Sequence, residues 1–135
     1  MILDHVGIAV SNYEKSKQFY TRILAPLGIT PVTEHDGWVG FGQNGKPEFW
    51  FGPGKDAKYF SHVAFIAATK AAVDLFYKIA IDEGAVCNGK PNLRQDYYPG
   101  YYGAFVIDPD GHYIGAVIHA QSLPQAGKVK SFNRA

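Results

Sequence analysis

The sequence predicts an α+β fold built from two βαβββ modules, because the chain repeats itself. An apolar run that begins with a histidine occurs twice, as His5–Val10 and His62–Ala67. The offset between these two histidines is 57 residues, and the same offset separates Phe19-Tyr20 from Phe76-Tyr77. Each copy also carries the same order of one strand, one helix and three strands. Repeats of this length bury their apolar faces against each other, so the two copies are expected to form one domain.

The first copy begins with alternating apolar residues over 2–10, which predict a strand. Ser11 with Glu14 three residues later is the pattern of a capping box, and it predicts a helix that runs to about Leu24. Pro26 and Gly28 end this helix. Three strands are then expected, at 30–33, 38–42 and 48–51, with Asn44-Gly45 as the hairpin signal between the last two.

The second copy repeats this order. Thr69 is expected to cap a helix that continues to Ile81 and stops at Gly84. The expected strands are 61–67, 85–87, 102–107 and 113–119, with a polar loop at 90–100. The segment Asp108-Pro109-Asp110-Gly111 is expected to form the tight turn before the last strand. His112 is interpreted as a turn residue rather than a catalyst.

Length and composition limit the function classes. The chain has 135 residues, a formal charge of +1 and no basic patch, so nothing indicates nucleic acid binding. Its one cysteine excludes an internal disulfide and favours a cytoplasmic location. No apolar run is long enough to span a membrane. We expect a single domain at 1–120, with modules at 1–55 and 56–120, followed by a tail at 121–135.

Candidate chemistry lies at the start of the repeated strands. Strand side chains alternate between two faces, so His5 shares a face with small residues, as does His62 in the second copy. Glu48 and Trp50 share a face of their own strand. If the sheet curls with its helices outside, His5, Glu48 and His62 converge. Two imidazoles and a carboxylate are a suitable ligand set for a divalent metal, although each histidine is equally explained as an ordinary hydrogen-bonded residue.

The motifs resemble those of the vicinal oxygen chelate superfamily, which includes glyoxalases, bleomycin resistance proteins and extradiol dioxygenases. The resemblance covers about residues 1–119. It rests on the following segments: Leu3–Val10, Ser16–Tyr20, Ser61–Phe65 and Ala104–His112. It implies that the paired modules form a curved half-barrel sheet around a metal. The family's ligand positions match His5, Glu48 and His62, and the ion would be Zn, Ni, Mn or Fe(II).

The fourth ligand of the family is usually a glutamate, and the matching position here is Gly115. Glycine has no group that can bind a metal or accept a proton. Ordinary glyoxalase I activity is therefore not expected, and ring-cleaving dioxygenase activity is expected even less. Three ligands remain, with Glu48 as the candidate catalytic base.

Substrate contacts are predicted from an aromatic loop and two tryptophans. Arg94 could clamp a carboxylate or phosphate, with Tyr97 and Tyr101 at the rim of the pocket. Trp38 and Trp50 are candidate pocket walls, although large aromatic residues more often belong to a core.

Two functions from different classes follow. The first is a metal-dependent lyase or isomerase that acts on a small oxygen-rich substrate. The second is a non-catalytic protein of the bleomycin resistance type that sequesters a hydrophobic or planar ligand. The resemblance also implies a homodimer, with the site either within one chain or between two. A third possibility is a degenerate member with neither activity. Metal content separates the first function from the other two, and stabilisation by a ligand separates the second from the third.

Overall fold

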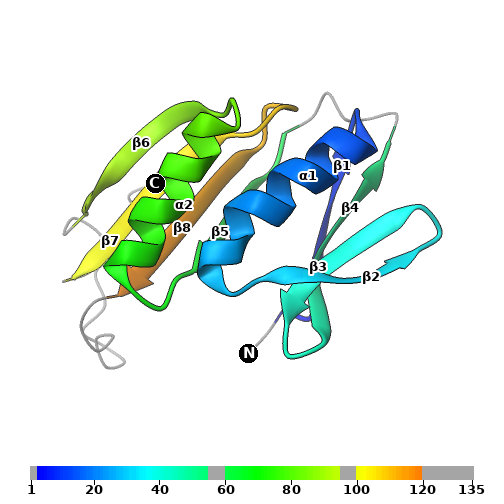
Figure 1. The fold of residues 1–135 in the computed structure, drawn as a ribbon, viewed down its shortest axis with the longest axis horizontal. Helices are drawn as coiled ribbons and strands as arrows, with labels where there is room; N and C mark the ends of the chain where they lie inside the picture. Colours follow the sequence, from blue (N-terminus) through cyan, green and yellow to red (C-terminus); the bar gives the residue numbers. More distant parts are fainter. Residues whose placement is uncertain (1–2, 55–59, 95–99, 120–135) are drawn as a thin grey trace.

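The structure is a computed structural model, and it describes residues 3–54, 60–94 and 100–119. The expected tail at 121–135 lies outside these residues. Within them the fold class is confirmed, because the chain forms two βαβββ modules, each with a four-stranded mixed sheet (Figure 1).

Module one comprises the first four strands, and module two comprises the last four. The elements of module one are β1 (Val6–Val10), α1 (Tyr13–Leu24), the 3₁₀ helix η1 (Ala25–Leu27), β2 (Thr30–His35), β3 (Trp38–Gln43) and β4 (Lys46–Pro53). Those of module two are β5 (His62–Ile66), α2 (Lys70–Asp82), β6 (Val86–Leu93), β7 (Tyr101–Ile107) and β8 (Tyr113–His119). The sheet orders are β1-β4-β3-β2 and β5-β8-β7-β6, so the repeat in sequence is also a repeat in topology. In each sheet the first strand pairs in parallel with the last.

The helix starts follow from local hydrogen bonding, with one correction. Thr69 caps α2 as predicted, and its hydroxyl accepts a hydrogen bond from the Ala72 backbone N–H at 3.0 Å. The cap of α1 is Asn12 rather than Ser11, because the Asn12 side chain accepts from the Lys15 N–H at 3.1 Å. Asparagine and serine are equally good caps, so composition could not choose between adjacent residues.

Several strand bounds differ from the expectation, two of them by four residues or more. The strand predicted over 2–10 is β1, which begins only at Val6, and the short strand predicted over 85–87 extends to Leu93 in β6. Part of the expected loop at 90–100 is therefore strand. Bulges interrupt the pairing of β6 with β7, so the residues of this strand do not alternate regularly between apolar and polar.

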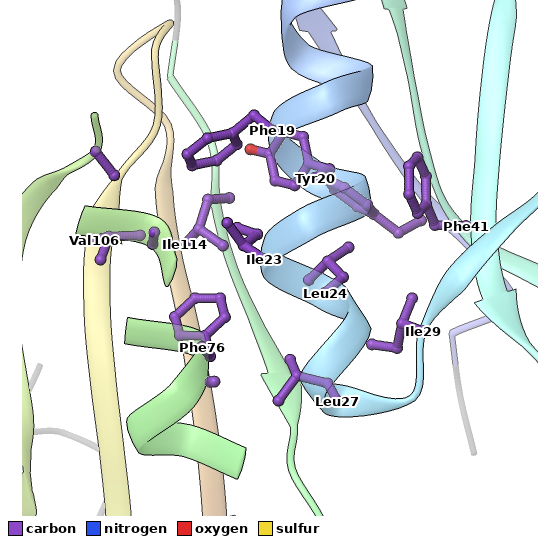
Figure 2. Close-up of a cluster of buried hydrophobic side chains, with 14 of the residues drawn as sticks. Phe19, Tyr20, Ile23, Leu24, Leu27, Ile29, Phe41, Phe76, Val106 and Ile114 are labelled. Atoms are coloured by element: carbon purple, nitrogen blue, oxygen red, sulfur yellow. The ribbon is translucent and has the colours of Figure 1, made fainter. Parts of the chain in front are cut away.

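One core serves both modules (Figure 2). The helices α1 and α2 lie side by side on one face of the sheets (Figure 1). Phe49 of β4 meets Phe65 of β5 edge to face, with ring centroids 5.1 Å apart, so the two sheets touch in the same apolar cluster. We call the sheet faces opposite this core the outer faces. They are left for a ligand or a partner.

A polar network in the turn before β8 ties module two to module one. Asp108 is buried, and its Oδ1 accepts from the backbone N–H groups of Asp110 and His112, each at 2.8 Å. Its Oδ2 accepts from the hydroxyl of Tyr20 on α1. Burial, followed by the charge of Asp108, raises the pKa of Tyr20 well above its ordinary value, so the phenol stays protonated and donates.

His112 forms the second half of this network and is almost completely buried. Its Nδ1 accepts from the backbone N–H of Ser61 at 2.8 Å, so the ring proton lies on Nε2. Nε2 then donates to the Ala9 carbonyl in β1 at 2.7 Å. The imidazole thus joins β1 to the entry of β5, and His112 is a structural residue rather than a simple turn residue.

No helix in the described part of the chain is both long and apolar enough to cross a membrane.

The buried Tyr20–Asp108 hydrogen bond should contribute measurably to stability. We expect Tyr20→Phe to lower the free energy of unfolding by about 1–3 kcal/mol, because it leaves a buried carboxylate oxygen without its donor. Tyr13→Phe is the matched control, since Tyr13 donates to the exposed Glu34, and it should cost less than about 0.5 kcal/mol. Urea denaturation measures both variants. Equal losses of unfolding free energy in the two variants would show that the Tyr20–Asp108 hydrogen bond stabilises the fold no more than the exposed one does.

Candidate functional site

The outer face of module one carries two tryptophans that lie against glycine backbone. A Cβ added to Gly52 would come within 2.5–2.7 Å of the Trp38 indole, and one added to Gly40 within 2.8–2.9 Å of the Trp50 indole. Both indoles therefore occupy space that a side chain would fill at any other residue. Backbone contact of this kind fixes the plane of each ring.

These rings line a cavity of about 520 Å³, which we call the tryptophan cavity. It is lined by His5, Gly7, His35, Asp36, Trp38 and Trp50. The volume is within the range of small-molecule sites. Aromatic walls with imidazole and carboxylate groups among the lining residues suit a planar organic molecule that carries polar substituents. Trp38 and Trp50 thus line the same cavity, and their role as walls of a binding pocket stays a prediction.

Glu48 does not join this cavity, although the alternation of β4 places it on the same face as Trp50. Phe41 of β3 pairs with Phe49, whereas the next residue, Gly42, pairs with Pro47. Glu48 is therefore the extra residue of a β-bulge, which redirects its side chain. The carboxylate instead lines two cavities at the junction of the modules, of about 200 Å³ and 460 Å³.

His5 lies at the start of β1 and lines both the tryptophan cavity and the smaller junction cavity, which it shares with Glu48. Its Nδ1 lies 2.8 Å from Asp4 Oδ2. The pKa of Asp4 is lowered, first by this hydrogen bond and then by the charge of Lys46. A neutral His5 that donates from Nδ1 keeps a lone pair on Nε2, the form that ligates a metal or accepts a proton.

The outer face of module two is filled by Phe105. A Cβ added to Gly115 would lie 2.5 Å from two carbons of the Phe105 ring. The Arg94 guanidinium stacks on the same ring, with its carbon 5.0 Å from the ring centroid. The position of the family's fourth ligand is therefore glycine beneath an aromatic ring, and a glutamate does not fit there unless Phe105 moves. Neither the composition nor the spacing of the sequence indicated this filling.

His62 contacts aromatic rings on this face. Its imidazole meets Phe105 and Tyr113 edge to face, at centroid distances of 6.5 Å and 6.2 Å. Tyr113 in turn stacks on the exposed Phe60 at 4.7 Å. His62 thus belongs to an aromatic cluster of module two and does not line the junction cavities that hold His5 and Glu48.

The predicted substrate contacts of module two lie around β7. Arg94 Nη2 donates to the backbone carbonyl of Lys90 at 3.0 Å and lies 3.5 Å from that of Gly103, so part of its donor capacity holds the bulged β6 in place. Tyr101 meets His119 edge to face at 5.0 Å, and burial lowers the pKa of His119. Tyr97 lies outside the described residues.

The predicted metal ligands do not come together within one chain. Across residues 3–54, 60–94 and 100–119, no group of three or more His, Cys, Asp or Glu side chains could hold a metal ion. The reason is the placement of the donors, since His5 and Glu48 share a junction cavity while His62 lies in the aromatic cluster of module two. The described residues of one chain therefore do not fit a metal.

Comparisons with known proteins agree with the fold and the motifs. The model of the glyoxalase/bleomycin resistance protein/dioxygenase superfamily matches residues 2–115. A glyoxalase/bleomycin resistance protein from Albidiferax ferrireducens T118 is 26% identical with a TM-score of 0.76, over 87% of this chain and 99% of that one.

Two further structures resemble the chain in fold. A glyoxalase/bleomycin resistance protein/dioxygenase family enzyme from Burkholderia phytofirmans PsJN is 20% identical with a TM-score of 0.65, over 86% of this chain and 97% of that one. A glyoxalase-related enzyme from Fulvimarina pelagi is 14% identical with a TM-score of 0.64, over 92% and 96%. No curated protein matches the chain.

The filling of the Gly115 site leads to a stability prediction. Gly115→Ala should lower the free energy of unfolding by about 1–3 kcal/mol, because its methyl group overlaps the Phe105 ring beneath Arg94. In a Phe105→Ala background the same substitution should cost less than about 0.5 kcal/mol. The wild type, Gly115→Ala, Phe105→Ala and the double variant form a double-mutant cycle, and thermal and urea unfolding measure the stability of each. Additive losses would show that Phe105 does not limit the space at this position.

Proposed function

Because the chain belongs to the glyoxalase/bleomycin resistance protein/dioxygenase superfamily, we propose that it binds a small planar organic molecule in the tryptophan cavity. The observation that supports this function is the close approach of the Trp38 and Trp50 indoles to the backbone at Gly52 and Gly40. Rings already held in position lose little conformational entropy when a ligand stacks on them. The proposal corresponds to the non-catalytic, sequestering function among the two predicted from the sequence.

Polar residues around the tryptophan cavity would orient the ligand. His5 lines the cavity with Nδ1 held by Asp4, and His35 Nε2 lies 3.2 Å from Asp36 Oδ2 in the exposed turn between β2 and β3. A hydroxyl or amide substituent on the ligand would pair with these groups at the rim, while the ring system packs on the indoles.

The test compares a planar probe with a saturated one. We expect 2-naphthol to bind more tightly than decahydro-2-naphthol by calorimetric titration, because only the planar molecule stacks on both indoles. Trp38→Ala and Trp50→Ala should each weaken binding by about tenfold or more. Gly52→Ala, which displaces the Trp38 ring without removing it, should also weaken binding.

Phe105→Leu on the outer face of module two is the control and should leave the affinity unchanged. Equal affinity for the two probes, or full binding by the tryptophan variants, would contradict the proposal.

A second function is favoured by the pairing of His5 with Asp4. A carboxylate that accepts from the Nδ1 of a histidine fixes the ring for metal binding through Nε2. We propose that two copies of the chain pair so that His5 and Glu48 of one copy and His62 of the other hold Zn, Ni, Mn or Fe(II). Such an ion would act as a Lewis acid on an oxygen-rich substrate in a lyase or isomerase reaction. Arg94, Tyr97 and Tyr101 would then contact that substrate.

Complementation between chains tests this second function. His5→Ala and His62→Ala should each abolish metal binding in elemental analysis of the purified protein. When the two variants are unfolded together and refolded, mixed dimers would contain one intact site, so part of the metal should return. A chain that carries both substitutions, His5→Ala/His62→Ala, should bind no metal after the same unfolding and refolding. Failure of the wild-type protein to bind any of the four ions would contradict the metal-dependent function.

A further inference from the structure

The two cavities that Glu48 lines adjoin each other between the modules. They share Leu3, Glu48, Phe49, Ala64 and Phe65, and we treat them together as one groove where β1 and β4 meet β5. We call this feature the junction groove. It is separate from the tryptophan cavity, with which only His5 is shared.

The walls of the larger part of the junction groove are mainly apolar, whereas the smaller part also carries Asp4 and His5. The larger part, about 460 Å³, is lined by Ile29, Phe41, Phe49 and Phe65 together with Ile66 at the end of β5. Leu3 and Ile66 are 69% and 76% exposed, which leaves large apolar side chains in water at the groove. An apolar ligand would cover this surface and gain free energy in proportion to the area removed from water.

Glu48 is the one carboxylate lining the larger part, and it has neither an ion pair nor a hydrogen bond within the described residues. The neighbouring cations are already engaged, because Lys46 Nζ lies 3.6 Å from Asp4 Oδ1 and 3.3 Å from the Asp4 carbonyl. His5 also pairs with Asp4. An exposed and unpaired carboxylate therefore lies at the edge of a mainly apolar groove.

We propose that the junction groove binds a small organic ammonium ion with a compact apolar body. The ammonium group pairs with the Glu48 carboxylate, and the body packs on Phe65 and on the exposed side chains of Leu3 and Ile66. A charge-assisted hydrogen bond beside an apolar surface is stronger than one in open water. A neutral molecule of the same shape makes the apolar contacts alone and binds more weakly. An anion is repelled.

The experiment uses 1-adamantylammonium, a rigid cation that does not suit stacking on indoles, and its neutral isostere 1-adamantanol. Calorimetric titration should show that the ammonium binds about tenfold more tightly than the alcohol. Glu48→Gln should reduce the affinity for the ammonium to that for the alcohol. Glu14→Gln, at an exposed glutamate of α1 away from the groove, should change neither.

The location is read from amide chemical shifts of ¹⁵N-labelled protein. Shifts should centre on Phe49, Ala64 and Phe65, with the indole signals of Trp38 and Trp50 unchanged. A tenfold excess of Zn²⁺ should leave the affinity for the ammonium unchanged. The proposal is overturned if the alcohol binds as tightly as the ammonium, or if Glu48→Gln has no effect. It is also overturned if the chemical shifts centre on the indoles or if Zn²⁺ displaces the ammonium. Burial of the groove in a dimer that excludes the probe would overturn it as well.

Discussion

The arrangement of the two modules depends on the buried network around Asp108. A buried carboxylate is tolerated only where every oxygen is hydrogen-bonded, and Asp108 meets this condition with donors from both modules. One oxygen holds its own turn, while the other accepts from Tyr20 on α1. His112 adds a bond to β1 through Ala9. Hydrogen bonds are directional, so this network constrains the orientation of the modules more strictly than apolar contact does.

This orientation explains why the candidate residues fall into three separate places. The helices and the inner sheet faces share one core, so the outer faces of the two sheets belong to different surfaces. Trp38 and Trp50 define one surface, and His62 with Phe105 defines the other. Glu48 lies at the junction between them. A site that used all of these residues together would have to be completed by a second chain.

On both outer faces, glycine leaves space that an aromatic ring occupies. In module one, Gly40 and Gly52 leave space that the indoles occupy, and a cavity remains above the rings. In module two, Gly115 leaves space that Phe105 fills, with Arg94 stacked on the ring. An aromatic ring in the space left by glycine therefore lines a cavity in module one. In module two the same arrangement occupies the family's fourth ligand position. The two modules thus share a fold, but the outer face of module one carries a cavity and that of module two is filled by Phe105.

The sequence by itself determined the two βαβββ modules, the cap at Thr69, the hairpin at Asn44-Gly45 and the turn at Asp108, because these features depend on residues close together in the chain. Trp38 and Trp50 were named as candidate pocket walls from the sequence, and the tertiary structure brought them to one cavity. Only the tertiary structure decided the direction of the Glu48 side chain, since a bulge depends on the partner strand. It likewise decided the separation of His62 from His5, because the distance between modules is set by packing between distant residues rather than by any local pattern.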